Sequence, residues 1–298
     1  MQKRGSKRAV LLIVCLLALL VALLGRTVRD EMRQQKANRA LITALESADA
    51  HAVHTLLDQG ADPDSFETPK RDVSLGRFLL DRLRGMNGAH TGTPALVLAV
   101  TEVRSPHQDN AGYARGVAIV KALLDHGAHI DIKDAQGVGL INLAVESNYD
   151  SQILRLLLQH HGNIALHGGK DPSALLNQKS PVNRRTPLLS AAAWGSPEEI
   201  DLLLSAGAKV DLPYDQGQTA LMAAVEKGRP ENIACLLKYH AGVLLKDRVG
   251  NTALSLARAN RAGNVVTSFN HEVDDDFWPN IVQMLEKQSS FRGGDGSR

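Results

Sequence analysis

The fold is decided by three copies of one short pattern: Arg185-Thr186-Pro187-Leu188, Gln218-Thr219-Ala220-Leu221 and Asn251-Thr252-Ala253-Leu254. The copies align without gaps, because successive threonines of the pattern are 33 residues apart. A threonine at the start of a helix caps free backbone N–H groups, and a proline directly after it sits where its missing N–H costs nothing. A regular period of this length predicts a solenoid built from similar helical units.

Each unit also ends in a leucine-rich segment. This segment is Ile200-Asp-Leu-Leu-Leu204 in one unit and Ile233-Ala-Cys-Leu-Leu237 in the next. The pattern predicts two short helices in each unit, joined by a tight turn. We expect Gly195 and Gly228 to supply the positive φ of that turn, because glycine adopts it at no steric cost. His240 stands where another unit has glycine and is expected at positive φ as well.

These features resemble the ankyrin repeat, which combines a Gly-x-Thr-Pro-Leu-x-x-Ala-Ala first helix, a turn, an Ile-Val-x-x-Leu-Leu second helix and a Gly-Ala-x-Val/Ile-Asp exit. Thr93-Pro94-Ala-Leu96 and Leu56-Leu57-Asp-Gln-Gly60 belong to further copies. The resemblance implies an all-α ankyrin-repeat solenoid of about six helix-turn-helix units with β-hairpin fingers. The repeat domain is expected over residues 39–288, in the approximate units 39–64, 88–131, 134–164, 182–211, 214–246 and 247–288.

Four segments depart from the period and are expected to be insertions: residues 65–86, 103–115, 165–178 and 261–277. The first carries apolar residues at helical spacing, namely Leu75, Phe78, Leu79 and Leu83. This spacing predicts an amphipathic helix that either folds onto the array or docks a partner. The third contains glycine, lysine and serine and is expected to form a flexible loop. Residues 289–298 are expected to be a disordered tail.

An uninterrupted apolar run, residues 9–25, follows four basic residues at the N-terminus. At about 1.5 Å per residue the run spans roughly 26 Å as a helix, enough to cross a bilayer core. It predicts a single N-terminal transmembrane helix, a signal-anchor, between a basic cytoplasmic segment (residues 1–8) and a stalk (residues 26–38). The repeat domain would then be extracytoplasmic, and periplasmic in a Gram-negative bacterium. A cleaved signal peptide is the alternative, although Ala22-Leu23-Leu24-Gly25 lacks the usual small-x-small cleavage site.

The composition favours helices and argues against several kinds of function. Only 4% of the 298 residues are aromatic, which suits helices that pack through small and aliphatic side chains. The net charge of +2 gives no general electrostatic footprint for nucleic acid. No nucleophile motif, phosphate-binding loop or metal-ligand spacing is present, and Asp274-Asp275-Asp276 is expected to be a solvated acidic loop. We therefore expect no enzyme activity, cofactor, metal or small-molecule substrate.

The resemblance implies binding through the finger tips and the exposed ends of the first helices. Carried over position by position, it selects these candidates for partner binding: Arg184, Arg185, Trp194, Tyr214, Asp215, Gln216, Glu226, Lys227 and Arg248. Trp194 is the most informative candidate, because a large outward aromatic residue is common at binding hot spots. Its alternative role is packing beneath the neighbouring finger, against Tyr214.

Two hypotheses of function follow. The first is a membrane-tethered module, of bacterial type, that captures a protein partner without catalysis. The second is a cleaved periplasmic or secreted protein that acts as an effector scaffold, neutralises a toxin or assists an envelope enzyme. In both hypotheses, the biological role is inferred by analogy with proteins of similar architecture.

Overall fold

The computed structural model describes residues 3–66, 92–103, 110–146, 151–160, 172–261 and 277–293. The chain forms two units, Met1–Ala95 and Leu96–Arg298. Most of the first insertion, residues 65–86, and nearly all of the fourth, residues 261–277, lie outside the described residues. The amphipathic helix and the acidic loop predicted in those two insertions therefore remain predictions.

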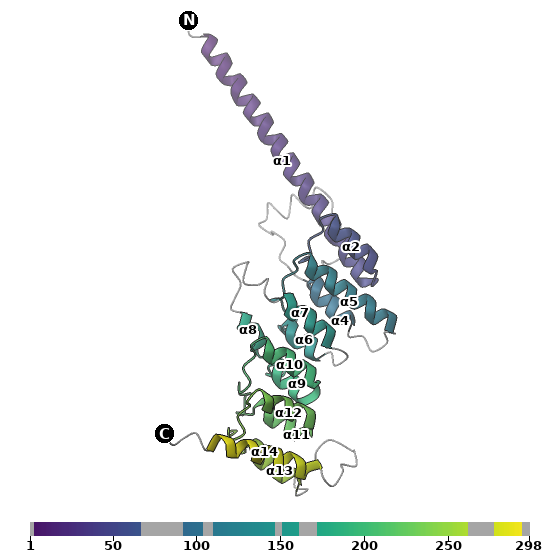
Figure 1. Ribbon diagram of the computed structural model, residues 1–298. Helices are drawn as coiled ribbons and strands as arrows, with labels where there is room; N and C mark the ends of the chain where they lie inside the picture. The colour runs from purple at the N-terminus through teal and green to yellow at the C-terminus, as the bar shows by residue number, and fades with distance from the viewer. Residues whose placement is uncertain are drawn as a thin grey trace. The chain divides into compact units, whose positions relative to one another are not determined.

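The first unit contains α1 (Lys3–Glu46) and α2 (Ala50–Asp58). α1 is one continuous helix through the predicted anchor, the stalk and the first helix of the first repeat, and it extends far beyond α2 (Figure 1). Asp49 caps α2 by accepting a hydrogen bond from the amide of Ala52 at 3.0 Å. Among the described residues, no helix has the length and apolar character needed to cross a membrane. Most side chains of the predicted anchor, residues 9–25, lie outside the described ones.

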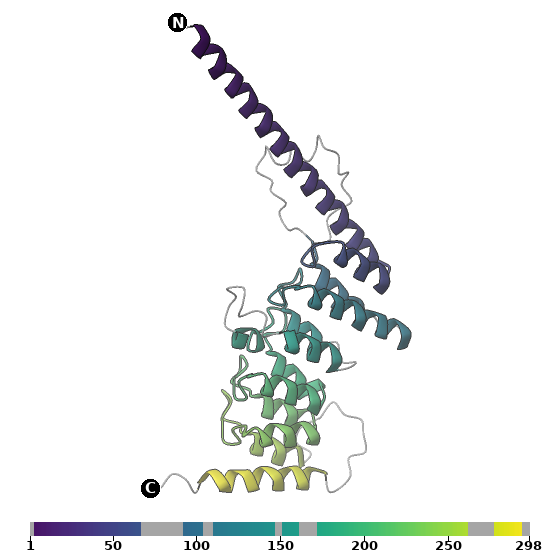
Figure 2. The same cartoon turned by 45° about the horizontal axis from the view of Figure 1, so that its top comes forward.

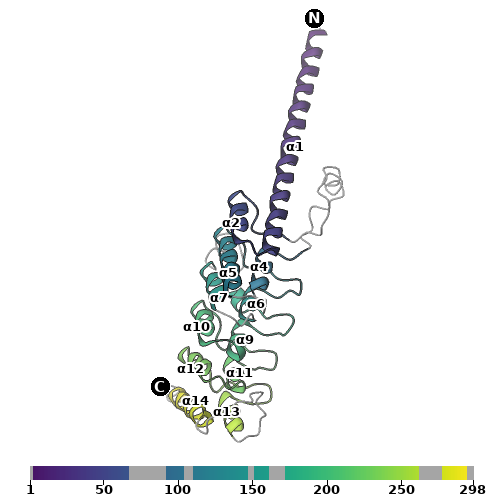
Figure 3. The same cartoon turned by 90° about the vertical axis from the view of Figure 1, so that its right-hand side faces the viewer.

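The second unit is a stack of helix pairs. Its first helices are α4 (Ala95–Val103), α6 (Leu140–Glu146), α9 (Pro187–Trp194), α11 (Ala220–Glu226) and α13 (Ala253–Arg261). Its second helices are α5 (Asn110–Asp125), α7 (Ser151–Gln159), α10 (Pro197–Ser205), α12 (Pro230–Lys238) and α14 (Phe277–Gly293). The pairs follow one another in chain order (Figure 2), with first and second helices in separate layers (Figure 3). This confirms the predicted all-α architecture of paired helices.

Small residues allow the first helices to be enclosed by their neighbours. Ala191 and Ala192 of α9 and Ala224 of α11 are fully buried, and α9 is buried along its whole length up to Ala193. A helix that is apolar on all sides is stable only when it is covered on all sides. The second helices contribute one leucine each at equivalent positions, Leu203 in α10 and Leu236 in α12, and both are fully buried.

The predicted caps are present at the helix starts. The hydroxyl of Thr186 accepts from the amide of Leu189 at 3.2 Å, and that of Thr219 accepts from Met222 at 3.4 Å. Ser196 and Glu199 form a reciprocal capping box at the start of α10. These contacts satisfy backbone donors that a helix cannot satisfy within its first turn.

One of the two glycine predictions is wrong. Gly228 has φ +58° and His240 has φ +61°, as expected for the turns that they occupy. Gly195 instead has φ −82°. Its lack of a side chain matters for a different reason: a Cβ there would lie 2.9 Å from the backbone of Ala191 and would collide with the carboxylate of Glu199. Close packing between α9 and the capping box therefore requires glycine at this position.

Several other segments differ from expectation. The third insertion is not a flexible loop throughout, because its second half forms α8 (Pro172–Leu176) with Leu176 fully buried. α5 begins at Asn110, so it includes the second half of the insertion 103–115. α14 continues to Gly293, into the predicted tail. The described residues contain two isolated β-bridges and no strand, so the fingers are hydrogen-bonded loops rather than β-hairpins.

Candidate functional site

The predicted binding residues lie on loops that connect successive repeats and on the adjoining helix ends. We call this surface the finger face; it comprises the loops 178–186, 211–219 and 244–252, together with Trp194, Glu226 and Lys227. The connecting loops project beyond the layer of first helices (Figure 3). A backbone hydrogen bond from an amide to a carbonyl closes each loop: Ser180 to Arg185 (2.8 Å), Tyr214 to Gln218 (2.8 Å) and Asp247 to Asn251 (2.9 Å).

Arg184 occupies a backbone position that the other two loops fill with glycine. The equivalent residues Arg184, Gly217 and Gly250 have φ values of +62°, +78° and +95°. The left-handed conformation costs a residue with a Cβ about 1–2 kcal/mol. A strained arginine on an exposed loop indicates that the side chain serves something other than the turn itself.

The side chain of Arg184 reaches the next loop along the array. Its Nε lies 3.0 Å from Oδ2 of Asp215, and Nζ of Lys179 lies 3.7 Å from Oδ1 of the same carboxylate. The hydrogen bond from Arg184 holds the pKa of Asp215 below its ordinary value, and the positive charges of Lys179 and Arg248 act in the same direction. Asp215 is therefore ionised at neutral pH and links two fingers.

Trp194 lies half-buried at the C-terminal end of α9. With Tyr214 it packs against Leu189, Ala193 and Ala223. This arrangement matches the alternative role foreseen for Trp194, packing beside Tyr214, but part of the indole stays accessible. The hydroxyl of Tyr214 donates to the carbonyl of Asn183 at 3.1 Å, which ties the second finger to the first.

Two cations lie over the indole ring of Trp194. The guanidinium carbon of Arg185 is 4.1 Å from the ring centroid, and Nζ of Lys227 is 5.4 Å from it. Cations at these distances are attracted by the negative face of the ring. We call Arg185, Trp194 and Lys227 the tryptophan platform.

The remaining candidates extend the face toward the last repeat. The carbonyl of Gln216 accepts a hydrogen bond from the amide of Arg248 at 2.8 Å, which joins the second and third fingers. Glu226 accepts from Nε2 of Gln218 at 2.6 Å. All nine predicted residues thus belong to one continuous surface, held by contacts between neighbouring repeats. Their role in binding a partner stays a prediction.

Sequence reasoning did not select two residues that organise this surface. Lys179 contacts Asp215, and Asn183 accepts from Tyr214 and donates to Glu146 at 2.7 Å. Both lie in the finger before Thr186, a segment adjoining the third insertion, where the repeat pattern is weakest. The signal that could have identified them is the presence of a charged residue, Lys179, and an amide residue, Asn183, in a finger.

The layer of second helices carries a separate set of polar contacts. Asp201 on α10 accepts from the hydroxyl of Tyr239 at 2.7 Å and lies 3.4 Å from Nζ of Lys238. The hydrogen bond from Tyr239 lowers the pKa of Asp201. Arg155 of α7 pairs with Glu198 of α10 in the same layer. These ion pairs join neighbouring repeats. Each of the four charged groups in them has a partner of opposite charge.

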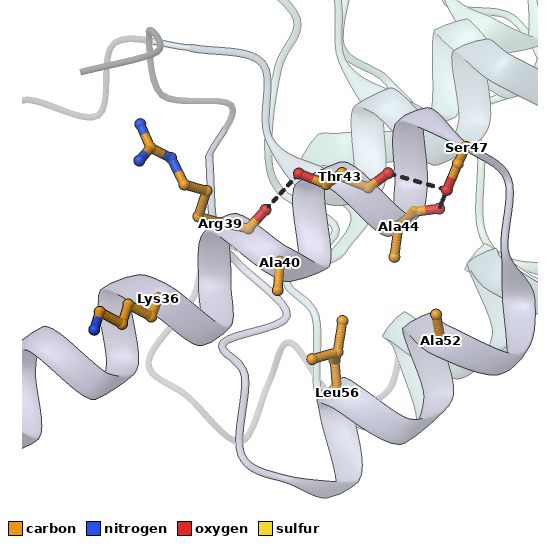
Figure 4. A pocket seen from close by; sticks show the side chains of 8 residues that line it. All are labelled: Lys36, Arg39, Ala40, Thr43, Ala44, Ser47, Ala52 and Leu56. Carbon is orange, nitrogen blue, oxygen red and sulfur yellow. Dashed lines mark hydrogen bonds between the residues drawn. The ribbon is translucent and has the colours of Figure 1, made fainter. Parts of the chain in front are cut away.

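A shallow groove lies between α1 and α2 in the first unit (Figure 4). Its lining comprises Lys36, Arg39, Ala40, Thr43, Ala44, Ser47, Ala52 and Leu56. Leu56 is half-buried, whereas the equivalent Leu203 and Leu236 of inner repeats are fully buried. The hydroxyls of Thr43 and Ser47 donate to backbone carbonyls of α1, as the dashed lines in Figure 4 show. None of the predicted site residues lines this groove.

Within the described residues, no group of three or more histidine, cysteine, aspartate or glutamate side chains is arranged to hold a metal ion. His160 pairs with Asp125 at 3.5 Å, and His126 contacts the carbonyl of Ala122 at 2.8 Å. Both histidines therefore have local structural partners.

Comparison with known families supports the repeat assignment. The family described as ankyrin repeats (3 copies) matches residues 110–214 and, in an overlapping alignment, residues 141–248. These residues contain α5 to α12 and most of the finger face. No curated protein matches the chain significantly. Ankyrin-repeat domains are in general non-catalytic modules for protein–protein interaction.

Proposed function

Since residues 110–248 carry ankyrin repeats, we propose that this protein is a membrane-tethered binding module that captures a protein partner on its finger face. The tryptophan platform is the centre of the proposed site. Arg184, Tyr214, Asp215, Gln216, Glu226 and Arg248 form its surroundings. The module carries out no catalysis and needs no cofactor, nucleic acid or small-molecule substrate.

The single observation that supports this site best is the half-buried Trp194 with two cations over its ring. A tryptophan that is held by its neighbours but partly accessible offers apolar area at small entropic cost, which is typical of a binding hot spot. The strained backbone of Arg184 supports the same surface, since the two equivalent loops use glycine there.

Affinity capture from the source organism tests the proposal. Full-length protein is used in mild detergent, in parallel with Trp194→Ala and with Tyr239→Ala, which removes a half-buried aromatic residue from the layer of second helices. We expect recovery of the partner to fall at least about tenfold for Trp194→Ala, in line with hot-spot energetics. Tyr239→Ala should recover the partner normally. Equal recovery by wild type and Trp194→Ala would reject the finger face.

The membrane tether is the second part of the proposal. It is supported by the apolar run at residues 9–25 and by the basic residues that precede it. The repeat domain then faces the extracytoplasmic side, which is the periplasm in a Gram-negative bacterium. A cleaved, periplasmic or secreted form, acting as effector scaffold, toxin-neutralising protein or enzyme accessory, is the competing proposal.

Two measurements distinguish the tethered form from the cleaved form. After an alkaline wash, the tethered protein sediments with membranes and retains Met1 on N-terminal sequencing. A shortened, soluble chain that begins near residue 26 would support the cleaved form instead.

A further inference from the structure

The finger face carries cations that no carboxylate neutralises. Among the described residues, Arg185 and Lys227 form no ion pair, and their side-chain nitrogens donate no hydrogen bond. The carboxylates of the same surface are engaged within the protein. Asp215 accepts from Arg184, Glu226 from Gln218, and Asp247 from the amides of Val249 and Asn251. Among the described residues, Arg185 and Lys227 therefore present side-chain N–H donors that the protein itself leaves unused.

The ring of Trp194 attracts both cations. Arg185 lies over the ring through its guanidinium carbon, 4.1 Å from the centroid, and Lys227 lies over it at 5.4 Å. Since the side-chain nitrogens of Arg185 donate no hydrogen bond, their fork geometry can bind a carboxylate through both of its oxygens. Because the side chains are already restrained, binding an anion there loses little conformational entropy.

The neighbouring charges indicate which anion fits. Asp215 and Glu226 lie on the same surface and would repel a dense array of phosphates, such as a nucleic acid or an anionic membrane. Single carboxylates that are spaced along a peptide can reach the platform and avoid these two groups. The accessible part of Trp194, beside Tyr214, adds apolar area that a peptide can cover and a free anion cannot.

We infer that the protein partner presents an acidic segment to the tryptophan platform, with Asp or Glu side chains bound to Arg185 and to Lys227 beside Trp194. This inference rests on the proposed function, because it assigns the chemistry of the partner at the same site. It adds to that function the requirement that the partner carry negative charge where it contacts the tryptophan platform.

Selection from a random peptide library, displayed on phage, tests the inference with the full-length protein in mild detergent. We expect the peptides that depend on Trp194 to be enriched in Asp and Glu. Synthetic copies of the best peptide are then titrated with wild type, Arg185→Gln, Lys227→Gln and Lys238→Gln. The last variant is a matched control, because it removes one positive charge from the layer of second helices.

The dissociation constant should rise about tenfold or more for Arg185→Gln and for Lys227→Gln, and it should stay within about twofold for Lys238→Gln. Replacing the acidic residues of the peptide with Gln or Asn should weaken binding to wild type to a similar extent. Peptides that need Trp194 but carry no acidic residues would overturn the inference and leave the proposed function intact. An equal effect of Lys238→Gln, or preferential binding of anionic vesicles, would also overturn it. Failure to select any Trp194-dependent peptide would reject both the inference and the proposed function.

Discussion

Replacement of Asn232 with alanine should destabilise the array strongly, because this side chain joins two successive repeats. Nδ2 of Asn232, on α12, donates to three carbonyls at the end of α9: those of Ala191 (3.3 Å), Ala192 (3.1 Å) and Gly195 (3.1 Å). Asn232 is only 2% exposed. Ala191 keeps a second hydrogen bond, from the amide of Gly195 at 2.8 Å. The substitution removes this donor from all three carbonyls, and it leaves those of Ala192 and Gly195 without the hydrogen bond that Ala191 retains.

The magnitude follows from those two carbonyls. A buried polar group that loses its hydrogen-bond partner costs about 1–3 kcal/mol. Since Gly195 is only half-buried and water can reach part of it, we expect the free energy of unfolding to fall by about 2–4 kcal/mol in total. This is a large share of the roughly 5–15 kcal/mol that stabilises a typical domain.

Urea denaturation followed by far-ultraviolet circular dichroism measures the effect. Asn232→Leu separates hydrogen bonding from packing, because leucine fills the volume but cannot donate. Asn251→Ala is the matched control, since Asn251 donates to Asp247 at 3.1 Å on an accessible finger where water can replace it. A loss below about 0.5 kcal/mol for Asn232→Ala, or full stability for Asn232→Leu, would refute the account based on hydrogen bonds.

Three further outcomes are expected. Arg184→Gly should weaken partner binding but leave stability nearly unchanged. The relief of about 1–2 kcal/mol of backbone strain is offset by the entropy of glycine, roughly 0.5–1 kcal/mol, and by loss of the exposed ion pair with Asp215, roughly 0–1 kcal/mol. Paired urea and binding titrations check this, and parallel losses in both would contradict it. Gly195→Ala should lower the free energy of unfolding by about 1–3 kcal/mol, because its Cβ meets the backbone of Ala191; an unchanged urea midpoint would show that α9 can shift to make room. Asp215 has a lowered pKa in the folded state, so its ion pair stabilises the protein above the ordinary pKa of about 4, and this contribution is lost as the pH falls through the folded-state value. The Tm difference between wild type and Asp215→Asn should therefore be present at about pH 6 and vanish as the pH falls below about 4, and a difference independent of pH would exclude an electrostatic origin.

Much of the fold follows from the 33-residue period. Thr186 and Thr219 cap their helices as expected, and Ala191 and Ala224 are buried where close helix packing was predicted. These features depend on residues within one or two turns of helix, so a linear pattern contains the information that they need. His240 and Gly228 were assigned correctly for the same reason, since a tight turn is a local structure.

Features that depend on contacts between repeats did not follow from the pattern. Gly195 has an ordinary φ, and its role became evident only when α9 was seen against the capping box of α10. α8 lies in a segment whose composition suggested a loop, but burial of Leu176 stabilises a short helix there.

For the candidate site, the sequence identified the residues, and the tertiary structure showed which of them contact one another. The repeat alignment selected Trp194 and the finger residues by position. It did not reveal that Arg185 and Lys227 share one indole ring, or that Arg184 reaches Asp215 in the next finger. The physical reason is that two of these contacts join residues about one repeat apart: Lys227 lies 33 positions after Trp194, and Asp215 lies 31 positions after Arg184. Their distances depend on the offset and rotation between successive units, which the pattern of a single unit does not contain.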